Sequence, residues 1–372
     1  MKKIPVTILF FAVLWLGMLA FIFLPKEQVS SDENRTLAKF PDVSAQSILN
    51  NSFSKDMESY VNDHAPFRSQ LVRLKNTAWQ FMGNSENNEV IFGAHGRLYR
   101  RMYVDDSCIE KNVKAVNDLA GMILPGARNV YFTLVPSAAQ IYSKDLPAGC
   151  QVPDEAALIQ DIYDSMDETV VTIDTLTPLV EAAKKNEANL YFKTDHHYTV
   201  YGAAEAGNAV LEQLLGIYDS SYGEHIKTMD GFYGSYFRRT PTYTVGSEKM
   251  DYLEYDSLTM SIGDTVYDNL VDDSKKDLAD KYGMLLHGNN ALLTIHNSKG
   301  KKGTRLLVCK DSYFNILAPM IANQYEEIDI IDLRYFTESF PEYIREHEGD
   351  ILLYFSLYNF DTENSIQYMS ID

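Results

Sequence analysis

Short apolar segments alternate with amphipathic helical segments in two stretches of this sequence, and this alternation does most to limit the possible folds. The first stretch predicts helices at 109–124, 155–167 and 176–185, with strands at 129–135, 170–173 and 190–192. The second predicts strands at 305–309, 328–331 and 351–356, with helices that end at 324 and span 341–346. Such alternation is typical of an α/β protein in which helices cover both faces of a parallel sheet.

The remaining segments predict elements around this core. Two helices are expected within 44–81, broken near Pro66, followed by a hairpin at 89–100 and a helix at 200–215. From 216 to 290 the pattern loosens into aromatic, glycine-containing sequence, which we interpret as a small β-rich insertion of short antiparallel strands and loops. Its tyrosines fit either ordinary β-surface packing or a glycan-facing platform.

The N-terminus predicts a membrane anchor. Lys2 and Lys3 precede an apolar run from Ile4 to Leu24, which is close to the ~20 residues that a spanning helix needs. The positive-inside rule keeps these lysines in the cytoplasm and places the rest of the chain outside. A cleaved signal peptide is the alternative, but the run is long and lacks a clear cleavage site. We therefore expect an anchor at 1–24, a linker at 25–43 and an extracytoplasmic domain at 44–372, held at the cell membrane by a single pass.

Charge and cysteine content narrow the function further. The net charge of −19, without any basic block, argues against a nucleic-acid partner. Cys309 lies in an apolar run and is expected to be a buried thiol. Cys108 and Cys150 could pair outside the cell, although their presence alone does not decide it.

The segment Lys193-Thr194-Asp195-His196-His197-Tyr198-Thr199 places two of the eight histidines beside a carboxylate. If the segment is extended, Asp195 and His197 share one face while His196 points elsewhere. A carboxylate that holds one imidazole nitrogen leaves the other free to take a proton from a nucleophile. A metal site would use the same residue types, but no H-x-x-x-H or C-x-x-C spacing accompanies them. A solvated loop without chemistry is the third interpretation.

Three further candidates follow predicted strands directly. Ser312, Arg334 and Asn359 come after the strands at 305–309, 328–331 and 351–356, and ligand groups gather at such strand ends in α/β sheets. Ser312 also precedes a helix, whose free N–H groups suit a developing oxyanion. The same position fits a helix-capping serine.

These motifs together resemble a known family. An Asp-Ser pair after the strand at 305–309 and an Asn after the strand at 351–356 resemble the SGNH hydrolases, with the Asp/His block moved to the front as in a circular permutation. Lys-Thr-Asp-His-His-Tyr-Thr, Glu33-Asn34-Arg35-Thr36-Leu37 and Lys-Asp-Ser-Tyr resemble the DHHW family, which is similar to alginate O-acetyltransferases. Tyr198 stands where the family signature has Trp, which changes the packing around that ring.

The resemblance implies residue roles and an activity. Ser312 would be the nucleophile, His197 the general base and Asp195 its orienter. Asn359 and the Ser312 N–H would form the oxyanion hole, whereas Arg334 replaces the expected glycine and could hold substrate. The implied activity is O-acetyl transfer to a cell-surface or secreted polysaccharide, with a membrane-bound O-acyltransferase as acetyl donor and without metal or cofactor. An acetyl esterase with the same triad and a non-catalytic glycan-binding or scaffold subunit remain alternatives.

Overall fold

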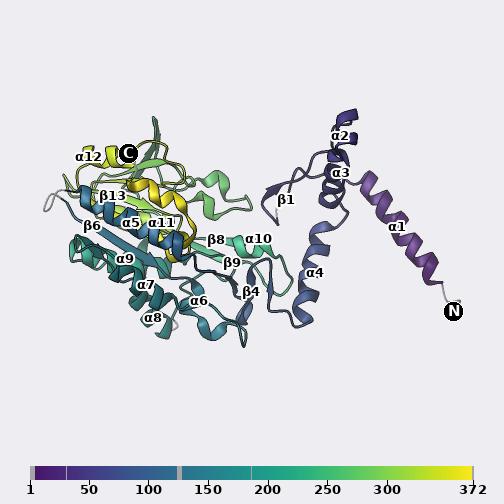
Figure 1. The fold of residues 1–372 in the computed structure, drawn as a ribbon, viewed down its shortest axis with the longest axis horizontal. Helices are drawn as coiled ribbons and strands as arrows, with labels where there is room; N and C mark the ends of the chain where they lie inside the picture. Colours follow the sequence, from purple (N-terminus) through teal and green to yellow (C-terminus); the bar gives the residue numbers. More distant parts are fainter. Residues whose placement is uncertain (1–4, 31, 124–127, 186, 371–372) are drawn as a thin grey trace. The chain divides into compact units, whose positions relative to one another are not determined.

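The structure is a computed structural model that describes residues 5–30, 32–123, 128–185 and 187–370. The chain forms two compact units, coloured along the sequence in Figure 1. The first unit comprises Met1–Asn88 and Phe237–Thr244, and the second comprises Glu89–Tyr236 and Val245–Asp372. The linker predicted at 25–43 and the domain predicted at 44–372 stay predictions.

An eight-stranded mixed sheet forms the centre of the second unit, with the strand order β11-β10-β12-β14-β13-β15-β6-β7. The strands are β6 (Val130–Val135), β7 (Val170–Thr172), β10 (Leu258–Ile262), β11 (Thr265–Tyr267), β12 (Leu292–Asn297), β13 (Arg305–Lys310), β14 (Glu327–Ile331) and β15 (Asp350–Ser356). The strands β14, β13, β15, β6 and β7 are parallel neighbours. The prediction of a mostly parallel α/β sheet is therefore confirmed.

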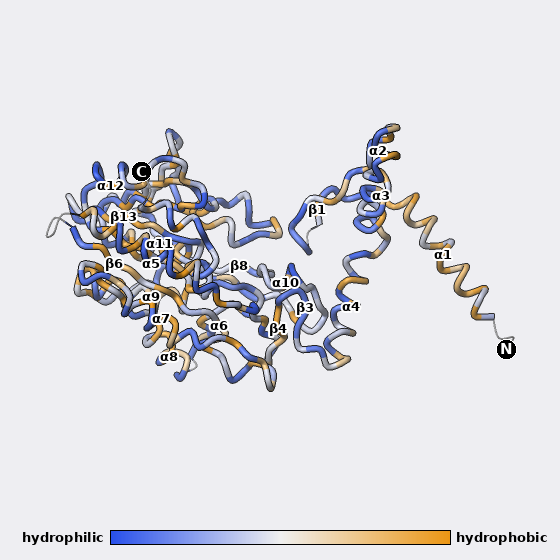
Figure 2. Tube along the Cα trace, in the orientation of Figure 1, coloured by the Kyte–Doolittle hydropathy of each residue, from blue (hydrophilic) through white to orange (hydrophobic). Residues whose placement is uncertain are grey.

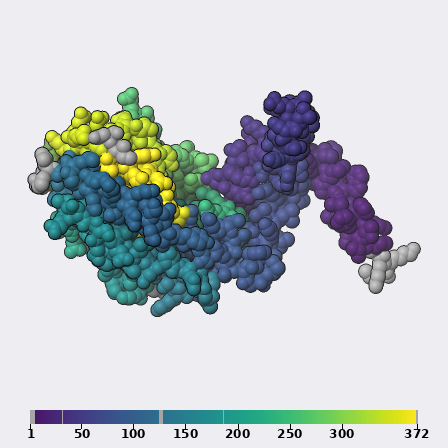
Figure 3. Space-filling view, viewed as in Figure 1, coloured from purple at the N-terminus to yellow at the C-terminus, as the bar shows by residue number. Residues whose placement is uncertain are grey.

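Helices cover both faces of this sheet because side chains alternate along each buried strand. On β13, Leu306 and Val308 pack into one hydrophobic cluster, whereas Leu307 and Cys309 pack into the other. The first cluster includes side chains of α8 (Leu176–Lys185), α9 (Val200–Leu215) and α11 (Phe314–Ala322). The second includes α5 (Asp106–Met122), α7 (Glu155–Asp164), α12 (Phe340–Glu346), α13 (Leu357–Thr362) and η6 (Asn364–Ser370). Figure 3 shows the C-terminal residues, in yellow, lying against the blue α5.

The antiparallel edge of the sheet was not predicted. Strands β10 and β12 pair antiparallel, and β12 joins β14, so part of the 216–290 region extends the main sheet. Only β8 (Ile226–Phe232) and β9 (Glu248–Leu253) form a separate antiparallel pair. Every second residue of β12 is only partly buried. Antiparallel strands with one half-buried face alternate apolar and polar residues, so they carry a weaker apolar signal than the buried parallel strands.

Shorter elements complete the second unit. They include β4 (Val90–Phe92) and β5 (Leu98–Arg100), which form the predicted hairpin, and the short helices α6 (Ala138–Ile141), η3 (Tyr222–His225) and η5 (Tyr282–Met284). Cys108, Cys150 and Cys309 are all free thiols, so the structure contains no Cys108–Cys150 bridge. Cys309 is fully buried, as predicted.

The first unit contains the apolar helix α1 (Val6–Phe23) and three further helices, α2 (Ala45–Leu49), α3 (Ser52–Asp63) and α4 (Arg68–Phe81). Figure 2 shows that α1 is hydrophobic along its length. Its 18 residues have a mean hydropathy of 2.6 and none is buried, and α1 alone among the described helices has the length and composition to cross a membrane. Lys2, Lys3 and Ile4 of the predicted anchor lie outside the described residues, as does Leu124 at the end of a predicted helix.

An ion cluster holds the Glu33-Asn34-Arg35-Thr36-Leu37 motif inside the first unit. The Arg35 guanidinium binds both the Asp63 carboxylate of α3 and Glu33. The hydrogen bond from Arg35 is the largest reason that the pKa of Asp63 falls to about 2. Glu33 also pairs with Arg68 at 2.9 Å. The motif therefore links the segment after α1 to α3 and α4.

Candidate active site

Ser312, His197 and Asp195 form one hydrogen-bonded chain. The Ser312 Oγ lies 2.9 Å from His197 Nε2, and His197 Nδ1 lies 2.5 Å from Asp195 Oδ1. All three residues are buried. In this arrangement the His197 Nδ1–H donates to Asp195 while Nε2 accepts the Ser312 hydroxyl proton. The structure thus brings together residues that lie 115 positions apart in the sequence.

The position of Ser312 follows from the centre of the sheet. Ser312 lies in the tight turn between β13 and α11, and β13 is the neighbour of both β14 and β15. The ends of three parallel strands therefore surround the serine, which is where α/β sheets place ligand groups. The Ser312 N–H donates to no group among the residues that the structure describes.

The prediction that His196 points away from Asp195 is wrong. His196 Nδ1 lies 3.3 Å from Asp195 Oδ1 and 2.8 Å from Ser235 Oγ. The rings of His196 and His197 are in contact, with centroids 3.7 Å apart. Both histidines therefore border the same carboxylate.

The local backbone explains this error. The segment at 190–192, predicted as a strand, makes only an isolated bridge between Tyr191 and Tyr198. The Asp195 side chain accepts the backbone N–H of His197 at 3.0 Å, which closes a turn of the kind that Asp favours. Because the chain bends there, alternate side chains do not separate onto two faces.

Two residues from the 216–290 region fit closely around Asp195. The Ser235 N–H donates to Asp195 Oδ2 at 2.6 Å, and the Gly234 N–H donates to Thr194 Oγ1. A Cβ atom at Gly234 would lie only 2.2 Å from the Asp195 Cβ. Glycine is therefore the residue that allows this close approach.

Glu248 supports the same segment from the start of β9. Its carboxylate accepts hydrogen bonds from the backbone of Lys193 and Thr194, both at 2.9 Å, and from the Thr194 hydroxyl at 2.6 Å. Burial raises the pKa of Glu248, which these hydrogen bonds oppose. Sequence analysis missed Glu248 because an acidic residue more than 50 positions away gives no local signal of this contact.

Replacing Gly234 with alanine should lower kcat/KM for a chromogenic acetyl ester by about 10²-fold, because displacing a catalytic group by about 1 Å has effects of that size. The added methyl group must move Asp195 or the turn that holds it. Gly246→Ala is the matched control, since nothing lies within 4 Å of a Cβ there. Wild-type kcat/KM and melting temperature in Gly234→Ala would show that this contact does not position Asp195.

The charges around Asp195 favour its ionised form. Burial alone would raise the pKa of Asp195, but His196, His197 and the Ser235 N–H hold it well below the usual range. Burial and the neighbouring His197 lower the pKa of His196. Asp195 therefore presents a negative charge to the His197 ring.

Tyr282 fixes the plane of the His197 ring. The two rings stack with centroids 3.7 Å apart and an interplanar angle of 7°. The Tyr282 hydroxyl donates to the Ser312 carbonyl oxygen at 3.0 Å. Tyr282 and Tyr236 are both buried, so these tyrosines of the 216–290 region are neither surface packing nor a glycan platform.

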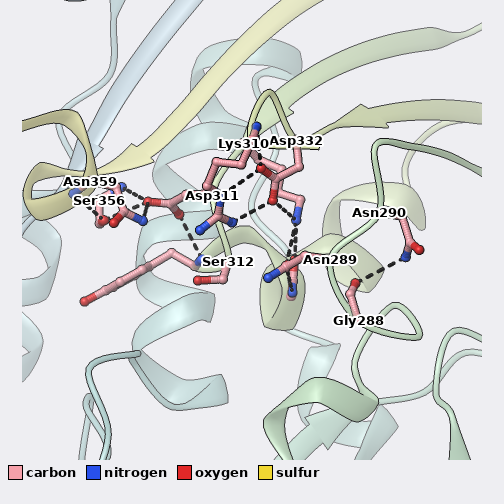
Figure 4. Close-up of polar contacts among 12 residues, drawn as sticks. Gly288, Asn289, Asn290, Lys310, Asp311, Ser312, Asp332, Ser356 and Asn359 are labelled. Atoms are coloured by element: carbon pink, nitrogen blue, oxygen red, sulfur yellow. Dashed lines mark hydrogen bonds and ion pairs between the residues drawn. The ribbon is translucent and has the colours of Figure 1, made fainter. Parts of the chain in front are cut away.

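Asp311 holds the turn that carries Ser312, as Figure 4 shows. Its Oδ2 accepts from the Ser356 N–H and hydroxyl, both at 2.7 Å, and from Asn359 Nδ2 at 2.8 Å. Its Oδ1 accepts from the Tyr313 N–H at 2.9 Å. One amide hydrogen of Asn359 is thus engaged with Asp311, and the second remains for another acceptor.

Lys310 and Asp332 form a buried ion pair beside this turn (Figure 4). Arg334 also pairs with Asp332. Asp332 accepts from Arg334 Nε at 2.8 Å and from its terminal nitrogen at 2.6 Å, and it also binds Lys310 Nζ at 3.3 Å. Burial lowers the pKa of Lys310, whereas the Arg334 and Lys310 charges keep the pKa of Asp332 low against its own burial. Arg334 therefore contributes to the scaffold of the strand ends, with 24% of its side chain exposed.

Tyr198, which stands at the Trp position of the family signature, lies behind the site. Its hydroxyl shares a hydrogen bond of 2.9 Å with the Tyr354 hydroxyl of β15. Its ring packs edge-on against Tyr313 at 5.2 Å. The departure from Trp thus adds a buried polar contact to the sheet.

Asp195, His196 and His197 could also offer three metal ligands, since their ligand atoms lie within 4.8 Å of one another. An ion held by Asp195 Oδ1 and His197 Nδ1 would replace the hydrogen bond between them, because a ligating imidazole nitrogen carries no proton. Metal binding at these atoms and a triad are therefore mutually exclusive uses of the cluster.

A mostly parallel sheet with Ser312 at a strand end and the turn of Asp195 and His197 beside it defines an α/β protein. The chain belongs to the DHHW family: the model of that family, described as DHHW protein, matches residues 82–331. The resemblance that the sequence motifs indicated is thereby confirmed. A comparison with curated proteins finds no match.

Solved structures show the same fold. A DHHW family protein from Eubacterium siraeum is 21% identical, with a TM-score of 0.62 over 76% of this chain and 95% of that one. PatB1 from Bacillus cereus, solved with a sulfonyl adduct, is 22% identical, with a TM-score of 0.60 over 76% of this chain and 99% of that one. At these identities the likeness describes the fold alone.

Proposed function

We propose that this protein is a membrane-anchored, extracytoplasmic O-acetyltransferase that acts on a cell-surface or secreted polysaccharide. The observation that carries the proposal is the continuous chain of hydrogen bonds from Ser312 through His197 to Asp195. A hydroxyl becomes a competent nucleophile when a base accepts its proton and a third group orients that base. The chain belongs to the DHHW family. The resemblance of that family's motifs to the alginate O-acetyltransferases supports the acetyltransferase class.

The reaction divides into two balanced steps. His197 Nε2 takes the proton of Ser312, whose oxygen attacks the acetyl carbonyl, and the donor leaves with that proton. An acetyl-Ser312 ester results. A sugar hydroxyl then gives its proton to His197 and attacks the ester, which releases the acetylated sugar and returns the proton to Ser312. Asp195 holds the imidazole tautomer and stabilises its charge in both steps.

The oxyanion would lie at the Ser312 turn. The Ser312 N–H and the second amide hydrogen of Asn359 are the donors that we assign to it. Preorganised donors of this kind are worth about 10²–10³-fold in rate. Arg334 keeps 24% of its side chain exposed beside the same turn, so we assign it to substrate contact at the rim of the site. The two hydrogen bonds that it donates to Asp332 support a fixed orientation.

The distinguishing experiment incubates the protein with a chromogenic acetyl ester, with and without oligosaccharide acceptors. An acetyltransferase should pass acetyl from Ser312 to the sugar, detected as an acetylated product by mass spectrometry. Release of free acetate alone, at a rate that oligosaccharides do not change, would indicate a carbohydrate acetyl esterase. Absence of any acetyl-Ser312 would favour the scaffold alternative.

The acetyl donor that we propose is a membrane-bound O-acyltransferase, and this requires that the protein stays at the membrane. If α1 is an uncleaved anchor, the full chain should remain with membranes after a high-salt wash and be digested by protease added outside protoplasts or spheroplasts. Mass spectrometry of the purified protein should find residues 1–24 attached. A soluble product that begins after this segment would instead indicate a cleaved signal.

A further inference from the structure

A cleft of about 670 Å³ opens in the second unit where β5 leads into α5. Pockets that hold small ligands have volumes of about 300–1,000 Å³, so it is large enough for a sugar unit. Its walls include Arg100, Tyr103, Asp105, Asp106, Tyr358 and Thr362. Tyr103 is 71% exposed at this cleft.

Arg100 is an incompletely satisfied cation in the wall of the cleft. Its guanidinium carbon lies 3.9 Å from the centroid of the Tyr358 ring. Its Nε is buried and has no hydrogen-bond partner among the residues that the structure describes. Buried donors in native proteins are normally paired, so the unpaired Nε–H leaves the Arg100 guanidinium with donor capacity that the described residues do not use. Arg334 differs, because Asp332 binds it twice.

Both walls of the cleft are connected to the candidate active site. On one side, the Leu98 N–H of β5 donates to the Lys193 carbonyl at 2.8 Å, which fixes the strand to the segment that carries Asp195. The Arg100 charge contributes to the lowered pKa of His196, so the two groups are within electrostatic reach. On the other side, Tyr358 directly precedes Asn359, which binds Asp311 beside Ser312.

We propose that Arg100 and Tyr358 form a subsite for an acidic sugar unit of the acceptor. The guanidinium binds a carboxylate or phosphate carried by the sugar, and the Tyr358 ring provides an adjacent apolar surface. Asp106 lines the same cleft and offers a carboxylate that accepts sugar hydroxyls. This combination suits a polyhydroxylated ligand with an anionic group rather than a bare anion. The inference rests on the proposed function and specifies its acceptor class.

The test measures binding without turnover. Full-length Ser312→Ala protein in detergent micelles is titrated by calorimetry with three oligomers of equal length, namely neutral N-acetylglucosamine, galacturonate and glycerol phosphate. At least one acidic oligomer should bind about tenfold or more tightly than the neutral one, as expected for a charge-assisted hydrogen bond. The galacturonate and glycerol phosphate arms show whether the preferred group is a carboxylate or a phosphate.

Arg100→Gln in the same background should raise the Kd of the acidic oligomer about tenfold or more and leave the neutral oligomer unaffected. Arg100→Lys should recover part of the affinity, because it keeps the charge but loses the planar fork. Arg305→Gln is the matched control, since Arg305 begins β13 at the opposite end from Ser312. Should Arg100→Gln not fold, salt dependence decides, because the acidic oligomer must bind more weakly at high salt.

Equal affinity for neutral and acidic oligomers, an unchanged Kd in Arg100→Gln or salt-independent binding would each overturn the subsite. These outcomes are separate from failure of the proposed function. A protein that binds acidic oligomers through Arg100 but never forms acetyl-Ser312 would retain the subsite and lose the acetyltransferase activity. If acetyl transfer is normal but Arg100→Gln leaves the Kd of the acidic oligomer unchanged, the acetyltransferase activity stands and the subsite is lost.

Discussion

Replacing Ser312 with alanine should lower acetyl transfer on the order of 10⁴-fold or more, and His197→Ala should lower it by a similar factor. Ser312 Oγ and His197 Nε2 lie 2.9 Å apart and act on the same proton, so neither functions without the other. The double mutant should therefore be no worse than either single mutant. Steady-state kcat/KM for a chromogenic acetyl ester measures all three, with melting temperatures to check folding.

A covalent probe gives an independent measurement of the same pair. Sulfonyl reagents react with activated nucleophiles. A sulfonyl fluoride should label Ser312 in the wild type but not in His197→Ala, because an unactivated serine is a poor nucleophile. Ser59→Ala, on the exposed face of α3, is the matched control and should change neither measurement. If the losses of kcat/KM in Ser312→Ala and His197→Ala multiplied in the double mutant, the two residues would not act as one proton-transfer unit.

The buried parallel strands could be predicted from the sequence because each is a continuous apolar run. In β13, Leu306 to Cys309 are all fully buried, two on each face, so no polar residue interrupts the pattern. The position of Ser312 followed from the same run, since the first polar residues after such a strand lie at its carboxyl end. Local pattern thus located one half of the site.

The other half depends on contacts that no local pattern contains. The bend at Asp195 arises from one side-chain hydrogen bond to the His197 N–H, and it places His196 against the carboxylate instead of away from it. Gly234 and Glu248 act on this bend from 39 and 53 positions beyond it, counted from Asp195. A close backbone approach at a glycine and a carboxylate that binds backbone amides are visible only once the chain is folded.

The predicted binding residues show the same limit. The sequence placed Arg334 and Asn359 at strand ends, but it did not predict which side chains they would bind. Asp332 accepts hydrogen bonds from two guanidinium nitrogens of Arg334, and Asp311 accepts one from the side-chain amide of Asn359. A strand-end position therefore predicts proximity to the site, whereas the remaining free donors decide what each residue can bind.

Replacing Asp195 with asparagine should lower kcat on the order of 10³–10⁴-fold, because neither orientation of the amide fits the surrounding donors. Asp195 Oδ1 accepts from the N–H and Nδ1 of His197, and Oδ2 accepts from the Ser235 N–H. With its oxygen toward His197, the amide NH₂ opposes the Ser235 N–H and no negative charge remains to stabilise the imidazolium. With its NH₂ toward His197, the amide opposes the His197 backbone N–H and forces the proton onto Nε2, which can then no longer accept from Ser312.

The comparison that isolates this effect is Asp154→Asn, at the N-terminus of α7. Asp154 caps the helix through its side-chain oxygen, and asparagine caps helices about as well as aspartate. The control should therefore keep wild-type kcat and melting temperature. If Asp195→Asn also kept kcat within about threefold of the wild type, the buried charge would have no part in catalysis, since losing its orientation and charge together must cost more than that. His197 would then be oriented mainly by its stacking on Tyr282, the other group that fixes the plane of the imidazole.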